Sequence, residues 1–421
     1  MNNTLIQAIK EEAIPLVDPY DFQLLIQEAN QAKYILLGES SHGTSEFYKT
    51  RAELSKKLIK EKGFTFIAVE GDWPACQQVN RYIKGYDTQH KNAREVLDSF
   101  NRWPTWMWAN EEIINLIEWL KEYNQHLPKE SKVGFYGIDI YSLWESMDEI
   151  IKYLEKTNSP DLAAAKKAFA CFEPFNREPQ MYGVSASFYG EDCHDEVIKL
   201  LTNITLNKYK HPSSEESHLD VEVNAIITAN AENYYRTMVV KDNESWNIRD
   251  RHMVEVINKI SAFYGIYAKG IIWEHNTHVG DARATDMADE GLVNVGQLLR
   301  EQEDKGNIFI IGFGTHRGTV IAADEWGVNF ERMIVPPAMD GSWEDFMHKA
   351  GPHDKLLIFN ENNRHLFNKR IGHRAIGVVY RPSHEQYGNY VPSVMSDRYD
   401  AFIYINSTIA LHPLEVETIH I

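Results

Sequence analysis

Cysteine is scarce in this chain of 421 residues, which contains only three. Cys76, Cys171 and Cys193 form no Cys-x-x-Cys pair, and an odd count leaves at least one sulfur unpaired. Small secreted domains that depend on disulfide bonds carry cysteines in larger, even numbers. We therefore expect no disulfide scaffold, and we expect the three cysteines to be reduced residues that pack in the interior.

Long apolar runs and excess positive charge are also lacking. No segment approaches the ~20 consecutive apolar residues that a membrane-spanning helix needs, and the first residues show no basic stretch leading into an apolar core. The 43 Lys and Arg residues are outnumbered by 61 Asp and Glu residues, for a formal net charge of −18. Such a charge repels nucleic-acid phosphates and anionic lipids. We expect a soluble, cytoplasmic protein with no nucleic-acid partner and no membrane partner; its oligomeric state stays open.

Short apolar runs alternate with helix-like periodicity at both ends of the chain. This alternation is typical of a mostly parallel sheet joined by crossover helices. We therefore predict a three-layer α/β fold in which a mostly parallel central sheet is flanked by helices. The predicted strands are Tyr34–Leu37, Phe66–Val69, Val133–Ile138, Gly270–Trp273, Ile308–Ile311, Leu356–Phe359, Ala375–Tyr380 and Ala401–Tyr404, and the helices among them are Ser45–Lys62, Trp73–Lys84 and Asn110–Leu127.

The middle of the chain has a different pattern, without a convincing strand. Helices are predicted over Asp161–Phe172, Leu219–Met238 and Asp250–Phe263, whereas 177–210 is predicted to be irregular. We interpret this region as a helical subdomain inserted into the sheet domain. The predicted division is 1–143 for the first part of the α/β sheet domain, 144–265 for the helical subdomain and 266–421 for the second part of the sheet domain.

Acidic and histidine side chains follow the predicted strands at the points where the strands end. Ligands of open parallel sheets bind outside the carboxyl ends of the strands. General acid–base chemistry and metal binding both need Glu, Asp and His side chains that are brought together. The residues at these strand ends are Glu39, His42, Glu70, Asp72, Asp139, Glu274, His275, His278 and His316.

The segment Gly38-Glu-Ser-Ser-His-Gly-Thr is the sharpest signal. Its glycines flank a tight strand-to-helix connection, so His42 lies near the positive end of the helix, which favours the neutral imidazole of a general base. The alternative is that His42 only caps the helix. Arg51 lies about two and a half helical turns further on, where it can orient a carboxylate or hold a carbonyl oxygen. Ser40 is disfavoured as a nucleophile, because the segment lacks the second glycine of Gly-x-Ser-x-Gly.

Two histidines, His275 and His278, lie three residues apart after the strand that ends at Trp273. Metal binding, proton transfer and a structural role are all compatible with this spacing. Together with His42 and Glu70, the pair would make a nitrogen–oxygen metal site, so a metal stays an alternative.

Aromatic residues gather at Trp103-Pro-Thr-Trp-Met-Trp, a pattern that favours packing over a wall for an apolar substrate. Tyr48, Tyr141 and Trp144 lie near strand ends and are candidates for such a wall.

Several segments of the chain resemble the erythromycin esterase family. They cover roughly residues 30–405 in order, so chance is not a serious alternative. Some relatives carry the label succinoglycan biosynthesis protein, which says little about chemistry. The matching segments are Leu37-Gly-Glu-Ser-Ser-His-Gly-Thr-Ser-Glu-Phe with Arg51, Ala68-Val-Glu-Gly-Asp-Trp-Pro with Val79-Asn-Arg-Tyr, Pro104-Thr-Trp-Met-Trp, Gly134-Phe-Tyr-Gly-Ile-Asp-Ile-Tyr-Ser-Leu, Glu244-Ser-Trp-Asn, Arg249-Asp-Arg-His-Met, Trp273-Glu-His-Asn-Thr-His-Val-Gly-Asp-Ala-Arg-Ala-Thr, Gly318-Thr-Val-Ile-Ala-Ala and Arg374-Ala-Ile-Gly-Val-Val-Tyr-Arg-Pro.

The resemblance implies an enzyme that hydrolyses a carboxylic ester, such as a macrolide lactone, without a covalent nucleophile or a cofactor. His42 matches the histidine that activates water, and Glu70 matches the carboxylate that positions the water or the histidine. Arg51 matches the motif arginine, Glu39 the first-loop carboxylate, and His275 belongs to the His-Asn-x-His pair. We expect His275 and Arg51 to polarise the carbonyl. The residues expected to bind the substrate are His278, Asp72, Asp139, Tyr48, Glu274 and His316.

Glu274 departs from many relatives, which have alanine there, and it adds a negative charge beside the site. The acidic strand ends favour a neutral or cationic ester, such as an amino-sugar macrolide, over an anionic one. Two alternatives stay open: a metal-dependent hydrolase that uses the same His and Glu residues, and a non-enzymatic protein that binds iron or haem, as related folds do.

Overall fold

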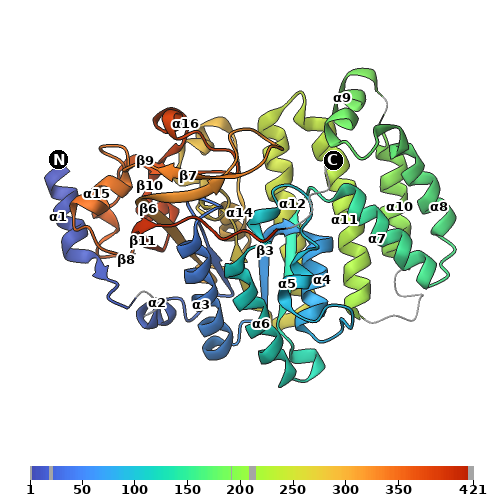
Figure 1. Ribbon diagram of the computed structural model, residues 1–421, viewed down its shortest axis with the longest axis horizontal. Coiled ribbons are helices and arrows are strands. Elements are labelled where there is room, and N and C mark those ends of the chain that lie inside the picture. The colour runs from blue at the N-terminus through green and yellow to red at the C-terminus, as the bar shows by residue number, and fades with distance from the viewer. Residues whose placement is uncertain (1, 19–21, 191, 208–214, 416–421) are drawn as a thin grey trace. The chain divides into compact units, whose positions relative to one another are not determined.

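A computed structural model describes residues 2–18, 22–190, 192–207 and 215–415 (Figure 1). Within them, the main sheet has nine strands in the order β1-β8-β11-β6-β2-β5-β3-β4, with β7 paired to β6. β2 runs parallel to β5 and β6, and β11 runs parallel to β6. The predicted α/β fold with a mostly parallel sheet is confirmed. The strands are β1 (Ile14–Pro15), β2 (Tyr34–Leu37), β3 (Phe66–Asp72), β4 (Gly134–Asp139), β5 (Gly270–Trp273), β6 (Ile308–Ala322), β7 (Glu331–Val335), β8 (Lys355–Ile358) and β11 (Ala401–Thr408), and a separate two-stranded sheet holds β9 (Arg370–Arg374) and β10 (Tyr390–Val394).

The chain divides into two compact units. The first comprises Met1–Ile67, Arg81–Gly134 and Lys269–His420, and the second comprises Ala68–Asn80 and Phe135–Ala268. No helix of the described residues combines the length and apolar character needed to span a membrane. Helices of the first unit are α1 (Asn2–Glu12), α2 (Gln23–Glu28), α3 (Ser45–Lys62), α5 (Ala93–Leu97), α6 (Glu111–Gln125), α13 (Asn276–Val279), α14 (Val295–Gln302), α15 (Trp343–Lys349), α16 (Glu385–Gly388) and α17 (Met395–Arg398). Helices that lie wholly or mostly in the second unit are α4 (Trp73–Ile83), α7 (Leu143–Lys156), α8 (Leu162–Phe169), α9 (Pro179–Tyr189), α10 (His194–Asn207), α11 (Glu215–Met238) and α12 (Asp242–Tyr264).

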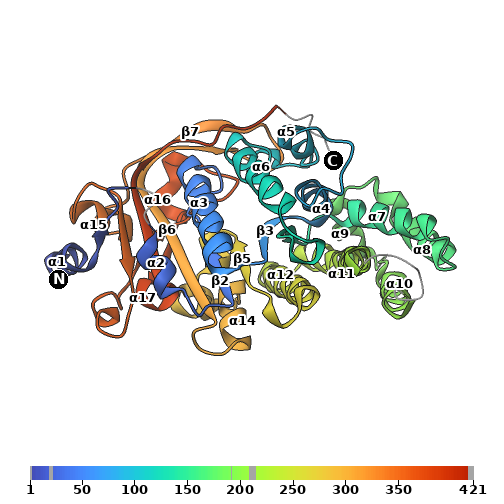
Figure 2. The same ribbon diagram turned by 90° about the horizontal axis from the view of Figure 1, so that it is seen from below.

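The register of the first unit brings the ends of two neighbouring strands together. Leu37, the last residue of β2, pairs with Trp273, the last residue of β5. The loops that carry Glu39 and His275 therefore leave the same edge of the sheet. After the β2 loop the chain forms α3, which packs against α6 (Figure 2) and ends at Gly63 in the left-handed conformation, with φ 68°.

One predicted strand is absent from the structure. Of the residues predicted as the strand Ala375–Tyr380, only isolated bridges at Ile376 and Val379 form. The N–H of Ile376 donates to Ser40, whereas the N–H of Tyr380 donates to Ala323. Because these backbone groups bond to separate segments, no continuous ladder forms.

The prediction of an irregular segment over 177–210 is also wrong, because α9 and α10 lie within it. Helix α9 has a proline in its first turn and ends at Gly190 in the left-handed conformation, which are ordinary start and stop signals. Its buried Gly183 lies against α11, where a β-carbon would come 2.5 Å from the carbonyl oxygen of Tyr235. Close packing against α11 therefore adds to the local signals that stabilise this helix.

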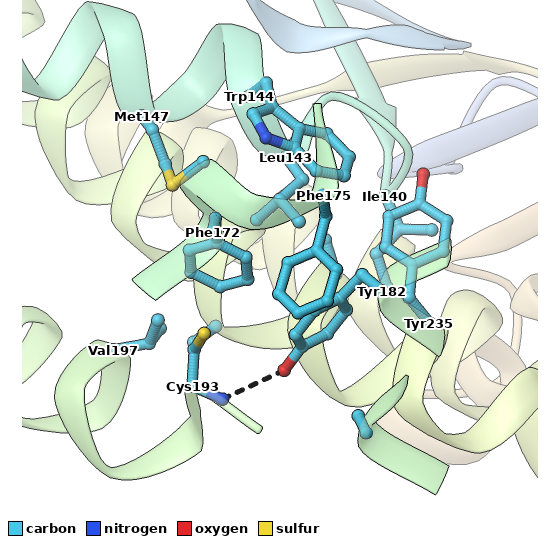
Figure 3. Close-up of a cluster of buried hydrophobic side chains, with 13 residues drawn as sticks. Ile140, Leu143, Trp144, Met147, Phe172, Phe175, Tyr182, Cys193, Val197 and Tyr235 are labelled. Atoms are coloured by element: carbon cyan, nitrogen blue, oxygen red, sulfur yellow. Dashed lines mark hydrogen bonds between the residues drawn. The ribbon is translucent and has the colours of Figure 1, made fainter. Parts of the chain in front are cut away.

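The second unit is a helical bundle in which α11 contacts α7, α9, α10 and α12 (Figure 1). Within it, one apolar cluster gathers aromatic side chains including Trp144, Phe172 and Tyr182 (Figure 3). The Tyr182 hydroxyl accepts a hydrogen bond from the N–H of Cys193 over 3.1 Å and donates to Glu232 over 2.6 Å. The domain boundaries predicted from the sequence stay a prediction.

A disulfide bond joins Cys171 and Cys193 beside this cluster. The expectation that all three cysteines are reduced is therefore wrong for this pair, whereas Cys76 is a free, buried thiol. The two cysteines lie 22 residues apart in the chain, and α9 folds back between them so that their Cα atoms are 5.9 Å apart. A sequence pattern cannot show such an approach before the helix is known.

Candidate active site

Two glycines shape the loop that carries His42. A β-carbon on Gly38 would lie 2.1 Å from Oδ1 of Asn276, and one on Gly43 would lie 1.9 Å from the carbonyl oxygen of Ile321. Both distances are shorter than any van der Waals contact, so only glycine fits at these two positions. The loop is also tied by its backbone, because the N–H of Ile321 donates to the carbonyl of Gly43 over 3.0 Å.

Glu39 holds both His42 and Arg51. Nδ1 of His42 lies 2.9 Å from Oε1 of Glu39, and Arg51 donates to Oε2 of the same carboxylate. All three side chains are buried. Because an ionised carboxylate only accepts hydrogen bonds, the proton of neutral His42 belongs on Nδ1 and its lone pair on Nε2. This is the tautomer of a histidine that removes a proton through Nε2.

Arg51 is fixed from several sides. Its guanidinium carbon lies 4.6 Å from the ring centre of Tyr48 and 4.7 Å from that of Trp273. Tyr48 and Arg51 are three residues apart on α3 and so share a helix face. The indole of Trp273 is held in turn by a 3.1 Å hydrogen bond to Ser55. The arginine is therefore positioned to neutralise and orient Glu39.

His275 lies beside His42, with the ring centres 4.9 Å apart. It is the N-cap of α13, and its Nδ1 accepts a 3.3 Å hydrogen bond from the N–H of Thr277 and lies 2.8 Å from the hydroxyl of that residue. Neutral His275 therefore carries its proton on Nε2. The two adjacent histidines thus hold opposite tautomers, one with a proton acceptor at Nε2 and one with a donor there.

The other candidates of the first unit differ in their surroundings. Glu274 and His278 are buried on either side of His275 along the chain. His316 instead stacks on His348 of α15, with the ring centres 3.8 Å apart. Burial and then the positive charges of His348 and Arg374 lower the pKa of His316 to about 4. Among the predicted residues of this unit, the structure thus joins Glu39, His42, Tyr48, Arg51 and His275 by direct contacts.

In the second unit, Arg249 holds two predicted acidic residues together. It donates from Nη2 to Glu70 over 2.7 Å, and from Nε and Nη2 to Asp139 over 2.8 and 2.7 Å. Burial alone would raise the pKa of Asp139, but the charge and hydrogen bonds of Arg249 outweigh it and lower that pKa. Asp72 lies half-buried at the end of β3. One cation thus binds both Glu70 and Asp139.

Arg249 was not among the residues predicted for the site. Its only sequence signal is the segment Arg249-Asp-Arg-His-Met, one of the segments that resemble the family. Its guanidinium also lies 5.0 Å from the ring centre of Tyr141, two residues after Asp139. In the described part of the chain, no group of three His, Cys, Asp or Glu side chains is arranged to hold a metal ion.

Comparison with known proteins gives one family model, described as erythromycin esterase, which matches residues 59–408. Erythromycin esterase type II from Escherichia coli is 31% identical over 138 residues, which cover 31% of this chain and 30% of that protein. The aligned part thus spans less than a third of that relative's length. YbfO of Bacillus subtilis (strain 168), whose name assigns it provisionally to the hydrolases, is 20% identical over 410 residues, covering 91% of this chain and 86% of YbfO.

Three solved structures share the fold. A succinoglycan biosynthesis protein superimposes with a TM-score of 0.79 at 21% identity and covers 98% of each chain. A protein from Bacillus cereus gives 0.81 at 20% identity, covering 99% of this chain and 100% of its own. A mutant of the erythromycin esterase EreC in its open conformation gives 0.68 at 16% identity, covering 94% and 97%. At these identities the likeness shows the fold alone.

Proposed function

The chain belongs to the erythromycin esterase family, and we propose that it hydrolyses a carboxylic ester or lactone with a water molecule that His42 activates. The observation that carries this proposal is the pair of adjacent histidines in opposite tautomers. Hydrolysis without a covalent intermediate needs a base that takes a proton from water and a donor that stabilises the oxyanion. The hydrogen bonds of His42 and His275 fit these two roles.

His42 is the general base in this scheme. Its Nε2 takes a proton from water as the oxygen attacks the carbonyl carbon, and the ring becomes an imidazolium. The Glu39 carboxylate, 2.9 Å from Nδ1, stabilises that positive charge and fixes the ring orientation. Arg51 holds the other oxygen of Glu39. We therefore assign Arg51 to positioning Glu39, a different role from the carbonyl contact predicted from the sequence.

His275 supplies the oxyanion donor. The N–H of Thr277 occupies Nδ1 of His275, so the proton on Nε2 points out of the other side of the ring. A donor of this kind strengthens its hydrogen bond as negative charge develops on the carbonyl oxygen, and removing one such donor costs about 3 kcal/mol of transition-state stabilisation. When the tetrahedral intermediate collapses, the proton on His42 passes to the leaving alkoxide.

The family resemblance assigns Glu70 the task of orienting the attacking water, and this assignment stays a prediction. The hydrogen bond from Arg249 fixes the position of Glu70 within the second unit. We also propose a preference for neutral or cationic esters. Glu70 and Asp139 share a single arginine, which leaves an excess of formal negative charge in this cluster of the second unit. These charges repel an anionic substrate.

A screen of activated esters and macrocyclic lactones with purified wild type, His42→Ala and His384→Ala tests the proposal. His384 is an exposed histidine, so its variant is a matched control for loss of an imidazole. We expect turnover by wild type and His384→Ala, and a loss of roughly 10²–10⁴-fold in kcat for His42→Ala, the usual contribution of a general base. A folded His42→Ala protein with the wild-type rate would contradict the proposal.

A further inference from the structure

Asn276 is a fully buried residue that directly follows His275 and begins α13. Its N–H donates to the carbonyl of Glu39 over 2.8 Å, and its own carbonyl accepts from Arg398 over 2.9 Å. Its side-chain amide accepts from the N–H of Phe313 over 3.2 Å and donates to the carbonyl of the same residue over 2.7 Å. One residue therefore ties the β2 loop, α13 and β6 together.

A buried histidine and a buried carboxylate lie behind this amide. Nδ2 of Asn276 lies 3.2 Å from Nε2 of His373, and Nδ1 of His373 bonds to Glu344 over 2.5 Å. An amide nitrogen only donates, so Nε2 of His373 accepts and its proton belongs on Nδ1, directed at Glu344. Glu344 also accepts from the backbone N–H of Arg374 over 3.0 Å.

The charge state of this pair follows from its surroundings. Burial lowers the pKa of His373 and outweighs the opposing charge of Glu344, so the ring is neutral. Burial alone would raise the pKa of Glu344, but the charge and hydrogen bond of His373 and then the charge of Arg374 outweigh burial and lower that pKa. A charged ring would place a proton on Nε2 against the N–H of Asn276, so the geometry selects the neutral ring. The neutral ring can then serve as a donor to Glu344 and an acceptor from Asn276 at the same time.

We propose that Asn276, His373 and Glu344 form a positioning chain that sets the spacing between Glu39 and His275, and so between the base and the oxyanion donor. None of the three is assigned a contact with the reacting atoms. The link is direct, because Asn276 bonds to the main chain of Glu39 and is the next residue after His275. This inference rests on the proposed function.

The side-chain amide of Asn276 lies where the β2 loop and α13 come into direct contact. Gly38 has no β-carbon at the point where Oδ1 of Asn276 lies, so the β2 loop and α13 meet at this amide without an intervening side chain. If His373 no longer accepts from Nδ2, one buried N–H of the amide is left unpaired beside an empty space, and Asn276 can shift together with the main chain that it holds. A misplacement of about 1 Å between reacting groups is enough to cost roughly 10²-fold in rate.

Kinetics of His373→Ala, His373→Gln and Leu357→Ala test the positioning chain. Glutamine can place an acceptor near the position of Nε2, so it is the conservative variant. Leu357 is a fully buried residue of β8, and its truncation is a matched control for lost packing. We expect kcat of His373→Ala to fall roughly 10–100-fold with KM within about twofold, a rescue of about fivefold or more by His373→Gln, and an unchanged kcat for folded Leu357→Ala.

Two kinetic results would overturn the inference. One is a His373→Ala protein whose kcat is within about twofold of wild type. The other is an equal loss of kcat in His373→Ala and Leu357→Ala, because the histidine would then act only through stability.

A readout without substrate separates this inference from the proposed function. In histidine-labelled protein, nuclear magnetic resonance reports the ring signals of His275. We expect these signals to shift in His373→Ala and to stay in place in Leu357→Ala. If wild type hydrolyses no ester, the proposed function fails, and the shift alone decides whether the chain positions His275. Unshifted His275 signals in His373→Ala would overturn the inference.

Discussion

Each of the two units contains an arginine that binds carboxylate side chains, but the two clusters have different compositions. In the first unit Arg51 pairs with Glu39 alone, and the other oxygen of Glu39 bonds to His42. In the second unit Arg249 is shared by Glu70 and Asp139. The first cluster is therefore an ion pair coupled to a titratable ring, whereas the second is an arginine with an excess of negative charge.

This difference assigns different tasks to the two clusters. A carboxylate bonded to an imidazole can stabilise the imidazolium that forms when the ring accepts a proton. A carboxylate pair held by one guanidinium keeps its charge and its geometry, which suits binding and orientation. Substitutions that remove one member of each cluster should therefore separate a loss of rate from a loss of stability.

The largest expected effect is on the rate, from Glu39→Gln. The amide no longer stabilises an imidazolium and can hold His42 in the wrong tautomer, so we expect kcat to fall by roughly 10²–10⁴-fold. Glu112→Gln is the matched control, because Glu112 is a buried carboxylate of α6 that bonds to His412 over 2.8 Å outside this cluster. Equal rates for the two variants would contradict the role assigned to Glu39 in supporting the imidazolium.

The next effect is on stability, from Arg249→Met. The substitution leaves two buried carboxylates without their cation, and breaking such a pair costs about 3–5 kcal/mol of unfolding free energy. Urea unfolding at pH 7 measures this loss.

The pH dependence of that loss has a definite sign. In wild type, the lowered pKa of Asp139 contributes stability that is present above the unfolded pKa and lost as pH falls through the folded pKa. In Arg249→Met the buried carboxylates instead favour protonation, so the variant gains stability as pH falls from 7 towards 5. A loss of stability that is constant between these pH values would contradict the shared-cation account.

A smaller effect is expected from the disulfide of the second unit. Closing a loop of this length stabilises by about 3 kcal/mol, so the Cys171→Ser, Cys193→Ser double variant should unfold at a lower temperature than wild type. Dithiothreitol should lower the unfolding temperature of wild type and leave that of the double variant unchanged. Titration of denatured, unreduced wild type should find one thiol; three would show that the bond does not form.

The smallest expected effect is that of a chelator. Nδ1 of both His42 and His275 is occupied by neighbours from the protein, and the proposed steps use side chains only. Exhaustive dialysis against a chelator should therefore leave ester turnover unchanged. Loss of turnover that a single divalent cation restores would favour the metal-dependent alternative.

Local signals explain which parts of the fold could be predicted. The bounds of β2 and α3 match the prediction, because an apolar run ends at Gly38 and a periodic helix stops at Gly63. α9 was missed although Pro179 and Gly190 are local start and stop signals, and its packing against α11 at Gly183 appears only in the folded chain. The segment Ala375–Tyr380 was predicted as a strand because it is apolar, but its backbone N–H groups donate to separate segments of the chain.

The sequence predicted which residues belong to the site, but not which of them contact one another. The strand-end rule selected Glu39, His42 and His275, and the structure joins them. It could not show that Glu39 is the carboxylate bonded to His42. Arg249 was missed because its partners Glu70 and Asp139 are 179 and 110 residues away in the chain. Charges brought together over such separations are a property of the folded chain.

Nitrogen chemical shifts of histidine-labelled protein at neutral pH report directly whether His42 and His275 hold opposite tautomers. We predict a proton on Nδ1 and an unprotonated Nε2 for His42, with the reverse pattern for His275. Signals are assigned by comparison with His42→Ala and His275→Ala. Two rings with the same tautomer would contradict the account, because one base and one donor could no longer be distinguished.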